Sequence, residues 1–121
     1  QNLFRGRAKP DGAVETELGV FYPPGLAFEN EVDVVLALRP EGASVVDEES
    51  DKTDFPKIRG VVKSRMFTGQ TYRVKIGEHG GSLLAFDLPN SKPPPRTANS
   101  ILLAIDPACM VVVEVSKEDA L

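Results

Sequence analysis

Hydrophobic side chains recur at every second position in three stretches of the chain, residues 13–22, 32–39 and 71–76. Successive side chains of a β-strand point to opposite faces, so this period places alternate residues in a core and the others toward water. We therefore predict a half-buried strand in each stretch, with 13–22 as one continuous element.

Three further runs are continuously apolar and rich in β-branched residues: 60–62, 101–105 and 110–113. This pattern is typical of strands that are buried on both faces. A helical periodicity of 3.6 is not evident in any long window, and only 117–121 is expected to form a short helical turn. The elements together predict an all-β fold.

Turn residues separate these strands. Residues 9–12 (Lys-Pro-Asp-Gly) predict a turn between the first two strands, residues 23–25 end the second, and 78–81 predict a hairpin loop. Two longer connections are an acidic loop, 47–54, and a proline-rich loop, 90–96. The acidic loop divides the single expected domain, 1–121, into two similar β-rich parts, 1–46 and 57–116.

The composition is that of an ordinary folded domain, with 121 residues of which 41% are hydrophobic and 26% charged. The net charge of −4 counts against binding to nucleic acid, which requires a positive surface. A single cysteine excludes an internal disulfide. The chain opens without a methionine or the apolar stretch of a signal peptide, so we expect a fragment of a longer protein.

Catalytic motifs are missing from the sequence. A phosphate-binding loop requires Gly-x-x-x-x-Gly-Lys-Ser/Thr, and the glycines at 77, 80 and 81 do not have that spacing. The single histidine, His79, stands thirty positions from Cys109, and the acidic loop lacks the order of a Ca²⁺ loop. We predict no catalytic, cofactor or metal site, and a small buried hydrophobic role for Cys109.

Basic and aromatic residues gather in one part of the sequence. Phe67 and Tyr72 are flanked by four cationic residues that we propose as contacts for a solute or a partner: Arg59, Lys63, Arg65 and Arg73. The arrangement is compatible with a small-solute or oxyanion-sensing module. It is also compatible with a barrel that stacks single-stranded nucleic acid on its aromatic rings, although the acidic charge disfavours this alternative.

An ordered set of short motifs carries a family resemblance. An apolar strand ends in Arg39-Pro40-Glu41, Gly60 lies in Gly-Val-Val, and Phe67, Gly69 and Tyr72 form an aromatic-x-Gly-x-x-Tyr segment. This order resembles the TOBE domain, the C-terminal regulatory region of ATP-binding subunits of ABC importers. The opening Asn-Leu-Phe-Arg-Gly is similar to the first strand of that region.

The resemblance implies a fold similar to the oligonucleotide-binding (OB) barrel, built as one barrel or as two small intertwined β units. It also implies a non-catalytic regulatory and dimerisation domain of an ATPase that imports ferric iron, polyamines or sugars. ATP and Mg²⁺ would bind in an upstream domain of the parent, outside this chain. The implied partners are that nucleotide-binding domain, a second ATPase subunit and the transmembrane permease subunits, and no nucleic acid is expected.

The implied location is the cytoplasm, peripheral to the inner face of the cell membrane. Edge strands are natural sites for contacts between copies. We expect such a contact at the apolar strand 109–115 or at the strand around Tyr72.

Overall fold

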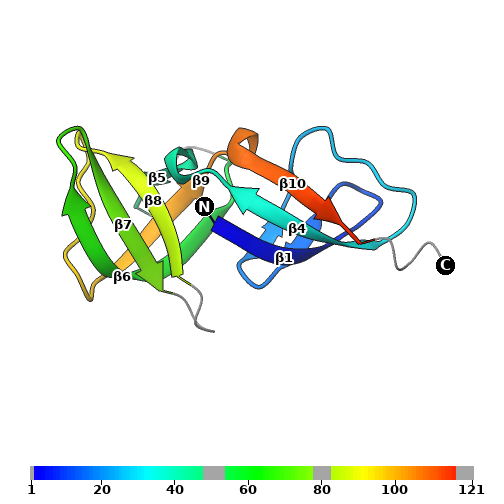
Figure 1. The fold of residues 1–121 in the computed structure, drawn as a ribbon, viewed down its shortest axis with the longest axis horizontal. Coiled ribbons are helices and arrows are strands. Elements are labelled where there is room, and N and C mark those ends of the chain that lie inside the picture. The colour runs from blue at the N-terminus through cyan, green and yellow to red at the C-terminus, as the bar shows by residue number, and fades with distance from the viewer. Residues whose placement is uncertain (1, 48–53, 78–82, 117–121) are drawn as a thin grey trace.

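The computed structural model describes residues 2–47, 54–77 and 83–116, and within these residues it contains ten strands in two five-stranded sheets (Figure 1). The strand pairs are all antiparallel. The two sheets lie side by side along the long axis of the molecule (Figure 1). The prediction of an all-β fold is confirmed.

The first sheet, here sheet A, has the strand order β10-β4-β1-β2-β3. Its strands are β1 (Asn2–Ala8), β2 (Val14–Thr16), β3 (Gly19–Phe21), β4 (Val32–Leu38) and β10 (Met110–Val115). The predicted turn at 9–12 joins β1 to β2, where the amide of Gly12 donates to the carbonyl of Lys9 at 3.0 Å and Gly12 has a φ of +93°.

The second sheet, sheet B, has the strand order β5-β9-β6-β7-β8. Its strands are β5 (Ala43–Val45), β6 (Lys57–Phe67), β7 (Thr71–Gly77), β8 (Leu83–Pro89) and β9 (Ser100–Ile105). The edge strand β8 contacts β5 at the other edge, so sheet B curls toward closure. This curl produces a half-barrel with a shared interior.

The two sheets exchange strands through two short 3₁₀ turns. β4 leads through η1 (Pro40–Gly42) into β5, which pairs with β9 in sheet B. β9 leads through η2 (Pro107–Cys109) into β10, which pairs with β4 in sheet A. Each half of the chain therefore contributes a strand to the sheet built mainly by the other half, which is how the two β units intertwine.

The hydrophobic core is continuous across the junction of the sheets. The larger cluster lies mainly in sheet B, around Phe86, and includes Phe21, Leu38 and Met110 from sheet A. A smaller cluster within sheet A contains Ala8, Val14, Val34 and Leu36. Phe4 packs against both clusters and meets Phe21 edge-on, with ring centroids 6.0 Å apart.

The prediction of one continuous strand over 13–22 is wrong. The stretch forms a tight hairpin of β2 and β3, because Thr16 pairs with Gly19 and the chain reverses between them. The hydroxyl of Thr16 donates to the carbonyl of Gly19 at 2.8 Å and accepts from the amide of Leu18 at 3.0 Å. Before the turn the even-numbered residue Val14 is buried, whereas after the turn the odd-numbered residue Phe21 is buried and Val20 and Tyr22 are exposed.

Two expectations about edges and burial also change. The run 110–113 is a strand and Met110 is buried, but β10 lies at the edge of sheet A, and Val111 and Val113 are 37% and 50% exposed instead of buried. The strand around Tyr72, β7, lies between β6 and β8 and presents no edge. Only β10 of these two strands is therefore open to pairing with another chain.

Some predicted features lie outside the described residues: the 78–81 loop with His79, most of the acidic loop, and the helical turn at 117–121. The strands that flank the 78–81 loop are described. β7 and β8 pair antiparallel over their whole lengths, as a hairpin requires.

Candidate functional site

The Arg39-Pro40-Glu41 motif lies where the chain passes from sheet A to sheet B. The amide of Arg39 donates to the carbonyl of Cys109 at 3.0 Å, and the amide of Gly42 donates back to Arg39 at the same distance. Pro40 begins η1, where its fixed φ suits the turn and its missing N–H is not needed. The motif thus joins the two crossings, and the side chains of Arg39 and Glu41 remain exposed.

Cys109 and Gly42 hold the two crossings close together. A Cβ atom at Gly42 would lie 2.4 Å from the Cβ of Cys109, so only glycine fits. Cys109 is half-buried there, and not a fully buried side chain as predicted. Burial raises the pKa of its thiol above the ordinary value, and the carboxylates of Asp106 and Glu41 raise it further. The thiol is therefore protonated at neutral pH and is a poor nucleophile.

Glycine is favoured at two positions of the family motifs, Gly60 and Gly69, for different structural reasons. Gly60 lies opposite Ile101 on β9 and beneath Ile76, and a Cβ atom there would lie 2.3 Å from the Cγ2 of Ile76. Gly69 is in the β6–β7 turn with a φ of +100°, a conformation that favours glycine, and it has open space around it. The first position is restricted by packing and the second by the backbone.

Phe67, Tyr72 and Arg65 form one cluster at the end of the β6–β7 hairpin. The rings of Phe67 and Tyr72 are 5.2 Å apart, and the guanidinium of Arg65 lies 4.8 Å from the centroid of Tyr72. Arg65 also donates to the carbonyl of Pro94 at 2.8 Å. Arg65 therefore fastens the proline-rich loop to the hairpin, a contact that fits cation–π and hydrogen-bond geometry.

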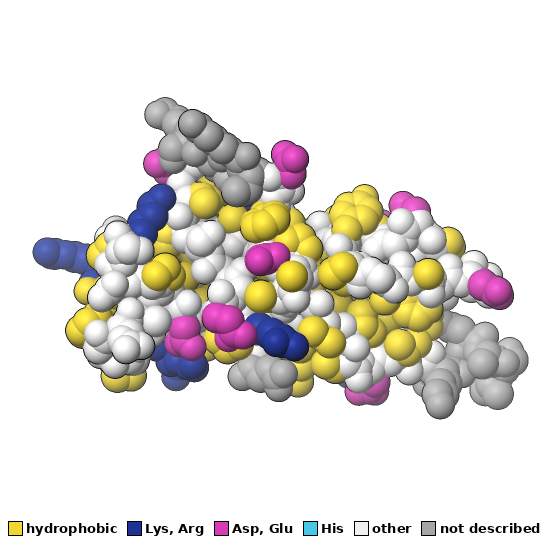
Figure 2. Space-filling view, turned by 90° about the horizontal axis from the view of Figure 1, so that it is seen from above, with side chains coloured by type: hydrophobic (Ala, Val, Ile, Leu, Met, Phe, Trp, Pro, Cys, Tyr) yellow, Lys and Arg dark blue, Asp and Glu magenta, His cyan; other side chains and the backbone are white. Residues whose placement is uncertain are grey.

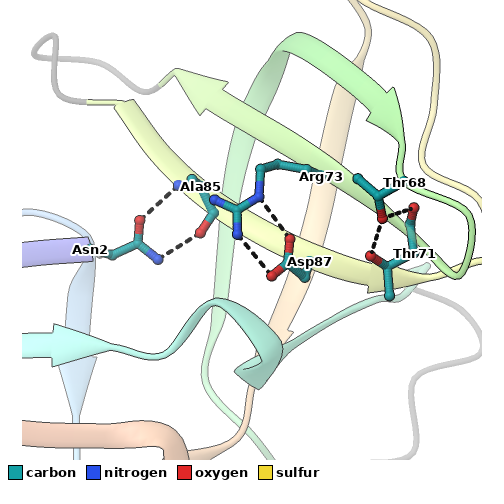
Figure 3. A network of polar contacts seen from close by, with 6 residues as sticks. All are labelled: Asn2, Thr68, Thr71, Arg73, Ala85 and Asp87. Carbon is teal, nitrogen blue, oxygen red and sulfur yellow. Dashed lines mark hydrogen bonds and ion pairs between the residues drawn. The ribbon is translucent and has the colours of Figure 1, made fainter.

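The other basic residues proposed as solute or partner contacts are spread over sheet B. Arg73 forms a bidentate pair with Asp87 on the facing strand, with both N–O distances at 2.9 Å (Figure 3). Lys63 lies over Gly77, where its side chain fills the space a Cβ atom would take. Arg59 is exposed and has a polar contact of its own. The four basic side chains, including Arg65, do not point into one shared pocket of the described structure. Their role in binding a solute or a partner stays a prediction.

Asn2 is the polar residue that links the two sheets, and sequence reasoning missed it. Its side-chain amide accepts from the amide of Ala85 at 2.7 Å and donates to the carbonyl of Ala85 at 2.8 Å (Figure 3). It also donates to the carbonyl of Leu38 at 3.2 Å, and the residue is only 4% exposed. The side chain therefore takes the place of a neighbouring strand at the free edge of β8. In the sequence, only its position in the opening Asn-Leu-Phe segment drew attention to it.

A hollow of about 890 Å³ lies on sheet A, on the face turned away from the core. Its charged lining consists of Arg5, Arg7, Glu15, Glu17, Asp33 and Glu114. Arg7 pairs with Asp33 at 2.8 Å. The hollow thus carries both signs of charge with more carboxylates than cations, which suits neither a nucleotide nor a nucleic-acid backbone.

Within the described residues, no group of three or more His, Cys, Asp or Glu side chains is placed to hold a metal ion. In the same ranges, 2–47, 54–77 and 83–116, no helix is long and apolar enough to cross a membrane. The described polar side chains that are fully buried all have hydrogen-bond partners, so none of them is left unpaired to bind a ligand.

The comparisons with known proteins agree with this architecture. The cytoplasmic molybdate-binding protein ModG, in a crystal form with molybdate bound, is similar to this chain with a TM-score of 0.70 and 13% identity, over 93% of this chain and 94% of that chain. At that identity the likeness shows the fold alone, and it confirms the expected OB-like fold. No curated protein matches the sequence. The family model of the TOBE domain matches residues 36–113, which is more than half of the chain. The chain therefore belongs to the TOBE domain family.

Proposed function

We propose that the chain is a non-catalytic regulatory and dimerisation domain of the ATP-binding subunit of an ABC importer, of the ferric iron, polyamine or sugar type. The observation that carries this proposal is the TOBE match over 36–113, which spans Arg39-Pro40-Glu41 and both strand crossings. In the family that the sequence resembles, this region follows the nucleotide-binding domain. ATP and Mg²⁺ would then bind upstream, and this chain would supply contacts instead of chemistry.

The position of the first strand supports a regulatory role. β1 begins where the two sheets meet (Figure 1), and Asn2 bonds to both sheets at that point. A domain joined to the start of β1 would be held by both sheets together. A displacement of that domain would therefore act on the whole β unit instead of on one loop. The proposed partners are this upstream domain, a second ATPase subunit and the permease at the inner face of the membrane.

Self-association and ATP binding test the proposal together. We expect sedimentation of the chain to show an average mass that rises with concentration toward that of a dimer. Titration calorimetry with Mg-ATP is expected to give no binding heat, because the described residues provide no phosphate loop. Tight ATP binding by this chain, or a monomer at every concentration, would contradict the proposal.

A second candidate is oxyanion sensing, and the molybdate-bound ModG neighbour is the observation that favours it. An oxyanion that binds the folded chain must raise its melting temperature. Ligand at a hundredfold excess over its Kd adds about 2.7 kcal/mol, which corresponds to several degrees for a domain of this size. Thermal melts with molybdate, tungstate, sulfate and phosphate, with chloride as the control, decide the matter, and an unchanged melting temperature with all four counts against this candidate.

A further inference from the structure

The outer face of sheet A, the face turned away from the core, carries a ridge of apolar side chains. Leu3, Ala37 and Val111 lie directly opposite one another on β1, β4 and β10, so they share one face. Leu3 is 56% exposed and Val111 is 37% exposed, while Ala37 is covered between them. Figure 2 looks onto the β10 edge of this sheet and shows hydrophobic side chains exposed along that edge, between scattered acidic ones.

The hollow described above adjoins this ridge on the same face. Its edge is the next outward-facing row, in which Arg5, Val35 and Glu114 lie opposite one another. The two rows are therefore two residues apart along β1 and β4, and three residues apart along β10 because of the register shift after Val112. The apolar row and the row that holds Arg5 and Glu114 therefore lie side by side on one face, where a second copy can contact both.

The charges of this row are not satisfied within the chain. In the part of the chain that the structure describes, neither Arg5 nor Glu114 has an ion-pair or hydrogen-bond partner. Val35 separates them on the intervening strand, so their backbones are about 10 Å apart. Among the described residues, this row thus presents one unpaired cation and one unpaired anion at a fixed spacing.

We infer that the outer face of sheet A is the surface through which two copies of this chain meet, an inference that rests on the proposed function. In a two-fold interface each patch meets the same patch, and with the axis parallel to β4 each outward-facing row meets the same row of the other copy, so Leu3 of each copy packs against Val111 of its partner. Arg5 of each copy then lies near Glu114 of its partner, giving two ion pairs. A partner of one sign would leave either Arg5 or Glu114 unpaired, which is why a second copy fits best.

Pairing through the edge of β10 is less suited to this role. The register of β10 against β4 shifts between Val112 and Glu114, so Val113 forms a bulge. A bulge interrupts the row of free backbone groups and turns an edge away from further strands. The exposed side chains of the face, and not the backbone of the edge, are therefore expected to carry the contact.

The chain offers a matched pair of leucines to test the apolar ridge. Leu3 and Leu83 are both 56% exposed, but Leu83 lies at the start of β8 in sheet B and is not in the rows proposed to make the contact. Sedimentation equilibrium of L3E is expected to give a dimer Kd raised about tenfold or more over the wild type, which is about 1.4 kcal/mol. The same substitution in L83E is expected to leave the Kd within about threefold.

A charge exchange tests the orientation and does not depend on how well each variant folds. R5E and E114R are each expected to weaken the dimer about tenfold, because each places like charges opposite one another. The double variant R5E/E114R restores opposite charges in the reverse order and is expected to recover the wild-type Kd to within about threefold. Melting temperatures of all variants are measured beside the Kd values.

The outcomes separate this inference from the proposed function. A wild-type dimer that L3E weakens, that L83E spares and that the double variant restores supports the inference. A wild-type dimer that L3E and L83E affect equally, or that the double variant fails to restore, overturns the inference and leaves dimerisation standing. A monomeric wild type overturns both.

Discussion

Replacing Gly60 with alanine is expected to lower the free energy of unfolding by about 2–3 kcal/mol, because the added methyl has no room. A Cβ atom there would lie 2.3 Å from the Cγ2 of Ile76 and 2.8 Å from the carbonyl oxygen of Gly77. Ile76 is only 2% exposed and belongs to the main core cluster, so it cannot move aside without displacing its neighbours. Urea denaturation measures the effect directly.

Gly77 provides the control for this substitution. It lies beside Gly60 in the same sheet, and a Cβ atom there would approach the Cε of Lys63 at 2.5 Å. The end of a lysine side chain swings away easily, so G77A is expected to reduce stability by less than about 1 kcal/mol. Equal losses in G60A and G77A would show that tight packing at Ile76 is not the cause.

Replacing Asn2 with alanine is expected to destabilise the chain by about 2–4 kcal/mol, since buried backbone groups would lose their partners. The variant removes three hydrogen bonds, two with Ala85 and one with Leu38, at a site that is 4% exposed. The amide and carbonyl of Ala85 would then lie at the edge of β8 without a partner. Thermal or urea denaturation checks the loss.

Asn30 is the matched control, because it is an exposed asparagine in the loop before β4. N30A is expected to change stability by less than about 0.5 kcal/mol. The prediction for Asn2 fails if N2A and N30A unfold at the same urea concentration. It also fails if N2A changes the slope of the transition alone, since that would point to an altered unfolded state.

The strands that sequence reasoning placed well are those whose two faces meet different surroundings. Burial alternates along β4 from Val32 to Leu36 and along β7 from Arg73 to Ile76, because one face packs on the core and the other is more exposed. The stretch 13–22 also alternates, yet its period runs through a tight turn that reverses the chain. An alternating pattern of apolar and polar residues predicts which side chains are buried, but it does not predict where the backbone reverses direction.

The valine run of β10 shows a second limit. Continuous β-branched residues predict a strand, and β10 is one. Whether a second layer covers that strand depends on its place in the sheet, which follows from pairing with β4 far back in the sequence. Burial was therefore predicted for side chains that the structure leaves partly exposed on the outer face.

The candidate site was predictable in its motifs but not in its contacts. Arg39-Pro40-Glu41 was singled out by its order among short motifs, and the structure places it at the strand crossing. The sequence indicates Arg73 as a contact for a solute or a partner, and its pairing with Asp87 could not be predicted because the two residues become neighbours only through the β7–β8 register. The contacts of Asn2 could not be predicted from its place in the opening Asn-Leu-Phe segment, since Leu38 and Ala85 approach it only in the folded chain.

The exchange of strands between the sheets has a consequence for synthesis. Leu38 ends β4, yet its outer partner, Met110, belongs to the last described strand. Sheet A is therefore incomplete on the ribosome until β10 has emerged, although four of its five strands are already made by residue 38. Such distant pairing raises contact order and slows folding. During that interval the unpaired side of β4 would be exposed, and a chaperone that covers it would guard against pairing with the wrong chain.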